Sequence, residues 1–200
     1  MDAKAAKRAM RAESIARRRA IPESVKAEAA QRVALNFGGA ITPLAGEVVS
    51  GYWPEPDELD VRPLLGALHA RGHAVALPVV AERGRPLMFR RWRPNDSLVA
   101  GALGIATPSP GAPELRPTIL LVPLLAFDRD GYRLGRGGGY YDRTLRVARA
   151  AGRVLAVGVA FAAQEVARVP HDDGDERLDW IVTETGAVRF EPASARLGSP

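Results

Sequence analysis

The chain has 200 residues, a length typical of one domain, and 46% of them are hydrophobic and 26% charged, which is ordinary for a protein with a full apolar core. It contains no cysteine, which excludes a disulfide framework and a thiolate metal site, and no apolar run approaches the roughly 20 residues that span a bilayer. The first residues, MDAKAAKRAM, lack the apolar segment of a signal peptide, so we expect a cytoplasmic protein.

The net charge of +5 is concentrated near the N-terminus. Residues 1–20 contain seven basic and two acidic side chains, whereas residues 164–200 contain four basic and eight acidic ones. A nucleic-acid-binding protein would carry its basic side chains over a whole face. We therefore favour a local anion site over a nucleic-acid-binding module.

Predicted helices and strands alternate along the chain. The alanine-rich residues 2–19 predict a basic helix, and residues 22–37 predict a second helix that ends at Gly38-Gly39. The later elements are strand 47–53, helix 57–72, strands 73–80 and 87–92, loop or lid 93–117, strand 118–128, helix 140–152, strand 153–161, short helix 162–169 and strand 178–186.

The central predicted strands are apolar on both faces, which is typical of a parallel sheet with helices on each side. The pattern predicts an α/β protein with one Rossmann-like domain over residues 1–200, a three-layer sandwich around a largely parallel sheet. We expect the tail from about residue 187 onward to be weakly ordered.

A glycine-rich loop, GRGGGYYD at residues 135–142, joins a buried strand to a predicted helix. Glycines let an anion approach the backbone amides, a helix N-terminus favours negative charge, and Arg136 adds charged donors. The pattern therefore predicts a phosphate site, with a flexible connector as the alternative. The loop is neither a Walker A motif, because no Gly-Lys pair occurs, nor a Rossmann fingerprint, because Tyr140 stands at the third glycine position.

Residues 122–143, VPLLAFDRDGYRLGRGGGYYDR, closely resemble the signature of the 5-formyltetrahydrofolate cyclo-ligase family, also called methenyltetrahydrofolate synthetases. Lys4 and Arg8 match the family's Lys-x-x-x-Arg helix, and Asp57-Glu58 match an acidic pair at the start of its third helix. Later matches, in family order, are Val159-Ala160-Phe161, Gln164, Val169-Pro170, Asp175 and Asp179. The resemblance reaches about Glu184 and implies conversion of 5-formyltetrahydrofolate to 5,10-methenyltetrahydrofolate, with ATP and Mg²⁺ as cofactors.

The resemblance also implies which residues bind the nucleotide. They are Lys4, Ala5, Ala6, Lys7 and Arg8 in the first helix and Arg133, Leu134, Gly135, Arg136, Gly137, Gly138, Gly139, Tyr140 and Tyr141 around the glycine loop. Arg136 and Lys4 are the expected catalytic residues. Lys4 and Arg8, one helical turn apart, would suit a solvated basic helix as well.

For the folate, the resemblance implies Glu58 together with Arg8, Arg136, Gly137, Gly138, Gly139 and Tyr140, and for the metal it implies Asp142 and Asp175. Glu58 and Asp142 would also suit plain acids at helix N-termini, and the acid-rich run HDDGDERLD leaves the register of the second metal-binding acid open.

Two positions depart from the family pattern and bear on the folate contacts. Pro78 is followed by Val79 and Val80 where some members have a tyrosine soon after the proline, and Thr107 stands where a glutamate is common. We expect a monomer that acts on a small-molecule folate, with no nucleic-acid or membrane partner. The main alternative is an ATP-dependent enzyme of the same fold with a non-folate substrate.

Overall fold

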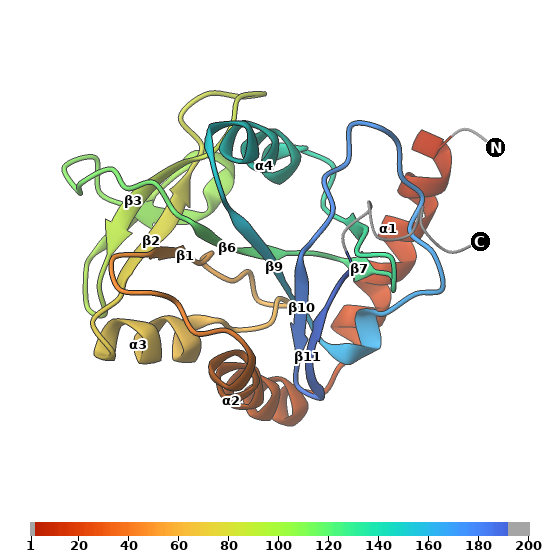
Figure 1. Ribbon diagram of the computed structural model, residues 1–200. Coiled ribbons are helices and arrows are strands. Elements are labelled where there is room, and N and C mark those ends of the chain that lie inside the picture. Colours follow the sequence, from red (N-terminus) through yellow and green to blue (C-terminus); the bar gives the residue numbers. More distant parts are fainter. Residues whose placement is uncertain (1–2, 192–200) are drawn as a thin grey trace.

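A seven-stranded sheet forms the centre of the protein, and helices cover both of its faces (Figure 1). The computed structural model describes residues 3–191. Five neighbouring strands run parallel, and an antiparallel strand borders them at each edge. In spatial order the strands are β11 (Gly186–Arg189), β10 (Trp180–Thr183), β9 (Leu155–Val159), β6 (Ile119–Pro123), β1 (Val48–Ser50), β2 (Ala74–Val79) and β3 (Met88–Trp92). The predicted largely parallel α/β architecture is confirmed.

Three helices make the outer layers of the sandwich (Figure 1). α2 (Glu23–Ala40) and α3 (Arg62–Ala70) cover one face of the sheet, where Phe37 is 1% exposed. α4 (Tyr140–Ala151) covers the opposite face, where Leu145 is fully buried. The strands between them are buried on both sides, which explains their almost unbroken aliphatic sequence.

The first helix belongs to neither layer. α1 (Ala3–Arg19) lies beyond the carboxyl ends of the parallel strands, where it packs against the 3₁₀ turn η2 (Ala162–Gln164) (Figure 1). Its inward side carries partly or fully buried polar residues at helical spacing, Lys7, Arg11, Ser14 and Arg18, beside Met10, which packs against a small apolar cluster. This end of the sheet therefore meets a row of cations and one hydroxyl.

The order of the strands creates a crevice at the same end of the sheet. From β1 the chain passes through α3 to β2 on one side, and from β6 it passes through α4 to β9 on the other side. β1 and β6 are neighbours, so the loops that follow them diverge from a common point. In open parallel sheets, ligands bind at the carboxyl ends of strands where the order reverses in this way.

Two predicted helix boundaries are wrong. α2 continues through Gly38 and Gly39, and Gly38 lies close to Arg71, where a Cβ atom would stand 3.3 Å from the guanidinium. The third helix begins at Arg62 rather than at residue 57, because Tyr52 binds the carbonyl of Leu59 and the segment between them forms a separate turn. The predicted acidic pair at 57–58 therefore lies in a loop, not at a helix N-terminus.

Segment 93–117 contains more structure than predicted. It forms a hairpin of β4 (Leu98–Ala100) and β5 (Ala106–Pro108), which encloses the 3₁₀ turn η1 (Ala102–Gly104) and contacts β2 and β3. Residues 113–115 pair with β3 through backbone hydrogen bonds. Thr107, the second departure from the family pattern, is 6% exposed and faces Gly101 inside this hairpin.

The C-terminal part also differs from its prediction. Only residues 162–164 of the predicted short helix are helical, because the amide of Val166 donates to the carbonyl of Phe127 instead. β11 occupies residues 186–189 and pairs with β10, so the predicted weakly ordered tail is wrong at its start. The part of that tail at 192–200, like residue 2 of the first helix, lies outside the described residues.

Candidate active site

The glycine loop lies at the switch point between β1 and β6. β6 leads into a two-stranded hairpin of β7 (Ala126–Phe127) and β8 (Arg133–Leu134), and residues 135–139 then connect β8 to α4. The loop is close to α1, because Arg11 Nε donates to the carbonyl oxygen of Gly135 at 2.9 Å.

The backbone shape of the loop requires its glycines. Gly137 and Gly139 have φ angles of 99° and 63°, in the left-handed region that side chains disfavour. A Cβ atom on Gly139 would stand 2.8 Å from Nη1 of Arg143, and one on Gly138 would stand 2.8 Å from the Tyr140 ring. The loop therefore folds back tightly on the first turn of α4.

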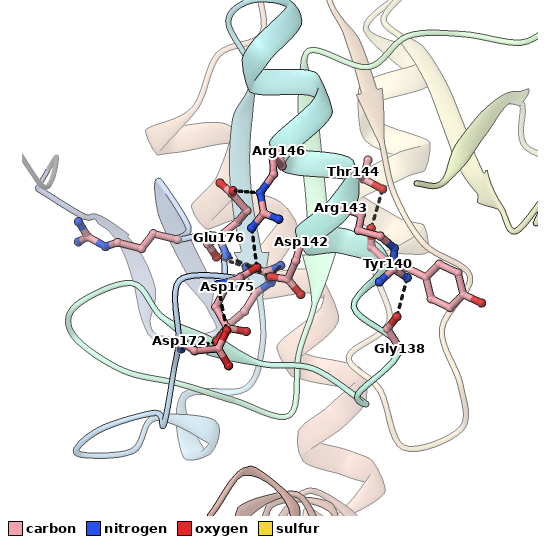
Figure 2. Close-up of polar contacts among 12 residues, drawn as sticks. Gly138, Tyr140, Asp142, Arg143, Thr144, Arg146, Asp172, Asp175 and Glu176 are labelled. Atoms are coloured by element: carbon pink, nitrogen blue, oxygen red, sulfur yellow. Dashed lines mark hydrogen bonds and ion pairs between the residues drawn. The ribbon is translucent and has the colours of Figure 1, made fainter. Parts of the chain in front are cut away.

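The N-terminus of α4 follows three exposed residues, Arg136 to Gly138. Among the described residues, no side chain caps the helix at Gly139. Arg143 donates to the carbonyl of Gly138 at 2.6 Å and lies 5.1 Å from the centre of the Tyr140 ring (Figure 2). Uncapped amides of a helix first turn next to guanidinium groups form an anion site.

An acidic loop faces the glycine loop across the crevice. It follows β1 and supplies Glu55, Asp57 and Glu58, all three of which surround the guanidinium of Arg136. Nη2 of Arg136 forms an ion pair with Glu55 and is 3.5 Å from Asp57 Oδ1, and its Nε is 3.6 Å from Glu58 Oε1. The Arg136 side chain is 44% exposed, so it can leave this position without unpacking the core.

Glu58 is the deepest of these three acids, with a side chain that is 10% exposed. Burial raises the pKa of Glu58, against the opposing hydrogen bond from the amide of Glu55 and the charges of Arg18 and Arg136. Asp57 behaves differently: burial acts to raise its pKa, but hydrogen bonds from Arg18 and the charges of both arginines outweigh burial and lower it. Two adjacent carboxylates thus differ in how readily they accept a proton.

Lys7 and Arg11 are the partly buried Lys-x-x-x-Arg pair of α1, and both contact the rest of the site. Lys7 Nζ forms ion pairs with Asp175 and, at 2.9 Å, with Asp172, and its side chain is 13% exposed. Lys4 and Arg8 are exposed one turn away on the same helix. The Lys-x-x-x-Arg spacing occurs twice in α1, and the sequence pattern alone does not distinguish the two pairs.

The two predicted metal-binding acids lie near each other at the first turn of α4, which contains Asp142 (Figure 2). Asp142 Oδ1 accepts hydrogen bonds from Arg133 Nη2 at 2.7 Å and from the amide of Glu176 at 3.1 Å, next in sequence to Asp175. Asp175 Oδ2 accepts from Lys7 and from the amide of Asp172. Each carboxylate has one oxygen in these contacts.

These residues fit a magnesium ion that is held mainly by phosphates. Within residues 3–191, no group of three or more histidine, cysteine or acidic side chains could enclose a metal ion. Mg²⁺ in phosphate sites usually keeps waters and takes one or two carboxylates. Asp142 and Asp175 can supply that number from the two segments that border the glycine loop.

Three of the remaining predicted residues have defined surroundings. Arg133 is 8% exposed and donates to Asp142 and to the carbonyl of Glu176, so its guanidinium links the first turn of α4 to the segment that contains Asp175. The Tyr141 hydroxyl is buried, and burial raises its pKa. Tyr140 begins α4 beside Gly138 and is partly exposed.

Reasoning from the sequence missed Arg11, Arg18 and Glu55. Arg18 is 2% exposed and binds Asp57 and the carbonyl of Leu124 at the end of β6. A signal for the arginines was present, since positions 7, 11 and 18 share one face of the helix. Glu55 carries no such signal, because its position depends on the path of the loop after β1.

The fold and the site together define an α/β enzyme with an anion site at the switch point of its sheet and a buried carboxylate opposite. The chain belongs to the 5-formyltetrahydrofolate cyclo-ligase family, whose sequence model matches residues 3–184. The resemblance seen in the sequence is thereby confirmed.

Individual relatives agree with this family. The 5-formyltetrahydrofolate cyclo-ligase of Escherichia coli K12 is 33% identical over 172 residues, which cover 84% of this chain and 94% of that protein. The Mycolicibacterium smegmatis protein of the same name is 36% identical over 166 residues, with 78% and 83% covered.

Solved structures share the fold. The Aquifex aeolicus 5,10-methenyltetrahydrofolate synthetase superimposes with a TM-score of 0.72 at 29% identity and covers 94% of each chain. The Mycoplasma pneumoniae synthetase, at 23% identity and a TM-score of 0.70, supports the fold alone.

Proposed function

We propose that the protein catalyses the ATP-dependent cyclisation of 5-formyltetrahydrofolate to 5,10-methenyltetrahydrofolate, with release of ADP and phosphate. Family membership supports this activity. The observation that carries it is the position of Arg136, on the glycine loop and within 3.6 Å of Glu58 across the crevice. A phosphate site and a candidate pterin-binding carboxylate thus share one crevice.

The chemistry requires the two substrates to meet there. The formyl oxygen is a poor leaving group, so it first attacks the γ-phosphorus of ATP, and ADP departs. N10 of the folate then attacks the activated formyl carbon, the oxygen leaves as phosphate, and N10 loses its proton. Holding the formyl oxygen in line with the γ-phosphorus and neutralising the phosphate charge are the main tasks of the protein.

The nucleotide phosphates would bind over residues 135–139. Backbone amides at the start of α4 provide uncharged donors, and Arg136 provides the mobile cation that moves from the acids to the phosphates. Lys7 and Arg11 would contribute from α1, with Lys4 and Arg8 on the adjoining exposed surface. Mg²⁺ held by Asp142 and Asp175 would neutralise phosphate charge.

The folate would bind on the other side of Arg136. Glu58 can accept hydrogen bonds from the amino and ring N–H groups of the pterin, since an ionised carboxylate accepts only. Tyr140, at the junction of loop and helix, would border both substrates. Thr107, which stands where a glutamate is common in the family, lies inside the β4–β5 hairpin, where its side chain packs against Gly101.

The test is an assay of purified protein with 5-formyltetrahydrofolate, ATP and Mg²⁺, in which the methenyl product is followed by its absorbance. We expect product only when all three are present. Nucleotide binding without product would contradict the proposal and would favour an enzyme of the same fold with a non-folate substrate.

Within residues 3–191, no helix combines the length and apolar character needed to cross a membrane. The cytoplasmic location, the monomeric state and the absence of a nucleic-acid partner stay predictions.

A further inference from the structure

Arg18 is a buried charged residue for which the reaction described above has no use. Its side chain is 2% exposed, whereas the adjacent Arg17 and Arg19 side chains are 39% and 73% exposed. Arginine is rarely buried to this extent unless all of its charge is paired. The position of Arg18 must therefore be explained by its partners.

Those partners belong to two different segments beyond α1. Nε and Nη2 of Arg18 both donate to Oδ2 of Asp57, at 3.2 and 3.0 Å. Its Nη1 donates to the carbonyl of Leu124 at 3.3 Å, directly after β6, and lies 3.6 Å from Oε1 of Glu58. One guanidinium thus ties the basic helix, the acidic loop and the end of β6 together at the switch point.

The second cation beside Glu58 is of a different kind. Arg136 lies at the same 3.6 Å from Oε1 of Glu58, but its side chain is 44% exposed and it belongs to the phosphate-binding loop. When Arg136 turns to the nucleotide, Arg18 is the cation that remains beside Glu58. Because Asp57 and Glu58 are consecutive residues, the two hydrogen bonds to Asp57 also restrict the backbone that carries Glu58.

We infer that Arg18 is a positioning residue for folate binding. It holds the Glu58 carboxylate in place when Arg136 contacts the nucleotide. The inference rests on the proposed role of Glu58 in folate binding. Its effect should be larger on the folate than on the nucleotide, because Arg18 contacts the glycine loop only indirectly, through Asp57 and Glu58, which also pair with Arg136.

The experiment measures equilibrium binding of 5-formyltetrahydrofolate and, separately, of ADP by titration calorimetry. The test variant is Arg18→Met with Asp57→Asn, which removes the buried charge pair as a unit and so avoids an unpaired carboxylate. We expect folate binding to weaken about tenfold or more, the effect of losing hydrogen bonds to a charged group. ADP binding should stay within about twofold of that of Asp57→Asn alone, which also lacks the charge beside Arg136.

Two matched controls accompany it. Arg17→Met removes a neighbouring arginine that pairs only with Glu13 in the contacts described, and should leave both affinities unchanged. Asp57→Asn alone retains an oxygen that accepts from Arg18, and should keep the folate affinity within about threefold. Unaltered folate binding in the folded double variant, or an equal loss of folate and ADP affinity, would overturn the inference.

A pH profile separates positioning from simple loss of structure. The charged and titratable groups around Glu58 are Arg18 from α1, Arg136 from the glycine loop, Glu55 and Asp57 from its own loop, Tyr52 after β1 and Tyr141 from α4. In Arg18→Met alone, which keeps Asp57, the Glu58 carboxylate ionises less readily, so the acid-side fall in kcat/KM for the folate should move to higher pH. An unmoved acid limb would contradict the inference.

Failure of the inference can be told apart from failure of the proposed function by Glu58→Gln. If this variant binds the folate as tightly as the unaltered protein, then the role of Glu58 itself is wrong. If it binds weakly whereas the Arg18 double variant binds normally, then only the positioning role of Arg18 is wrong.

Discussion

Lys7 in the first helix forms an ion pair with Asp175, although 168 positions separate the two residues in sequence. The pair joins a cation expected to contact phosphate to an acid expected to bind metal. The Asp175 side chain is only 20% exposed, and its ion pair with Lys7 compensates its charge before any ligand binds. Binding of a nucleotide with its metal should therefore exchange this ion pair for contacts to the phosphates.

Lys7→Met should impair nucleotide use more than Lys4→Met. Lys7 lies in the site and is 13% exposed, whereas Lys4 is an exposed residue one turn nearer the start of the helix. We expect the KM for ATP to rise about tenfold in the first variant, the effect of losing one charge-assisted hydrogen bond, and less than about threefold in the second. Initial rates over a range of ATP concentrations measure both, and an equal effect of the two changes would show that the inward pair has no special role.

Arg136→Ala should abolish most turnover without destabilising the fold. The side chain is 44% exposed and contributes charge rather than packing. Removing one preorganised donor at developing charge typically lowers kcat about 10²–10³-fold. Arg129→Ala is the control, since that side chain is 89% exposed and pairs with Glu165. Wild-type turnover in the Arg136 variant would refute the assigned role, and urea unfolding would reveal any general damage.

Gly139→Ala and Gly66→Ala should act in opposite directions. Alanine at position 139 would adopt a left-handed conformation at φ 63°, which costs about 1–2 kcal/mol, and its Cβ would crowd Arg143. Gly66 lies inside α3, where a Cβ atom would meet no described atom within 4 Å apart from the backbone of its own helix, so alanine should stabilise the protein by about 0.5–1 kcal/mol. Denaturant midpoints and ADP affinity provide the measurements. Only the Gly139 variant should lose ADP affinity, and a normal affinity would mean that the loop shape is dispensable.

Glu58→Gln should weaken folate binding and yet stabilise the protein at neutral pH. Burial raises the pKa of Glu58 above its unfolded value, so the folded state binds the proton more tightly than the unfolded state does. The stability contributed by the protonated form is then lost as pH rises from the unfolded to the folded pKa, and above that window the charged carboxylate is a net cost. Glutamine avoids this cost. Urea unfolding at neutral pH and at about pH 4 should show the gain mainly at neutral pH, and a less stable variant at neutral pH would contradict the sign of the shift.

The pattern of helices and strands, the glycine loop and the anion site could be read from the sequence, because each depends on residues close together in the chain. Alternating apolar runs predict a buried parallel sheet, and glycines before a helix allow amides to approach an anion wherever that segment lies. The family signature at residues 122–143 is local in the same sense.

Tertiary structure decided which local possibilities are used. Lys4 with Arg8 and Lys7 with Arg11 have identical spacing, and only the packing of α1 against η2 and the strand ends determines which pair is partly buried. Arg18 is buried by contacts with residues that lie 39 and 106 positions away in the sequence. The contacts of Arg136 with Glu55, Asp57 and Glu58 are likewise distant in sequence. A local pattern specifies the charge of such groups, but their pairing follows from the order of strands, which places the loops after β1 and β6 at one point in space.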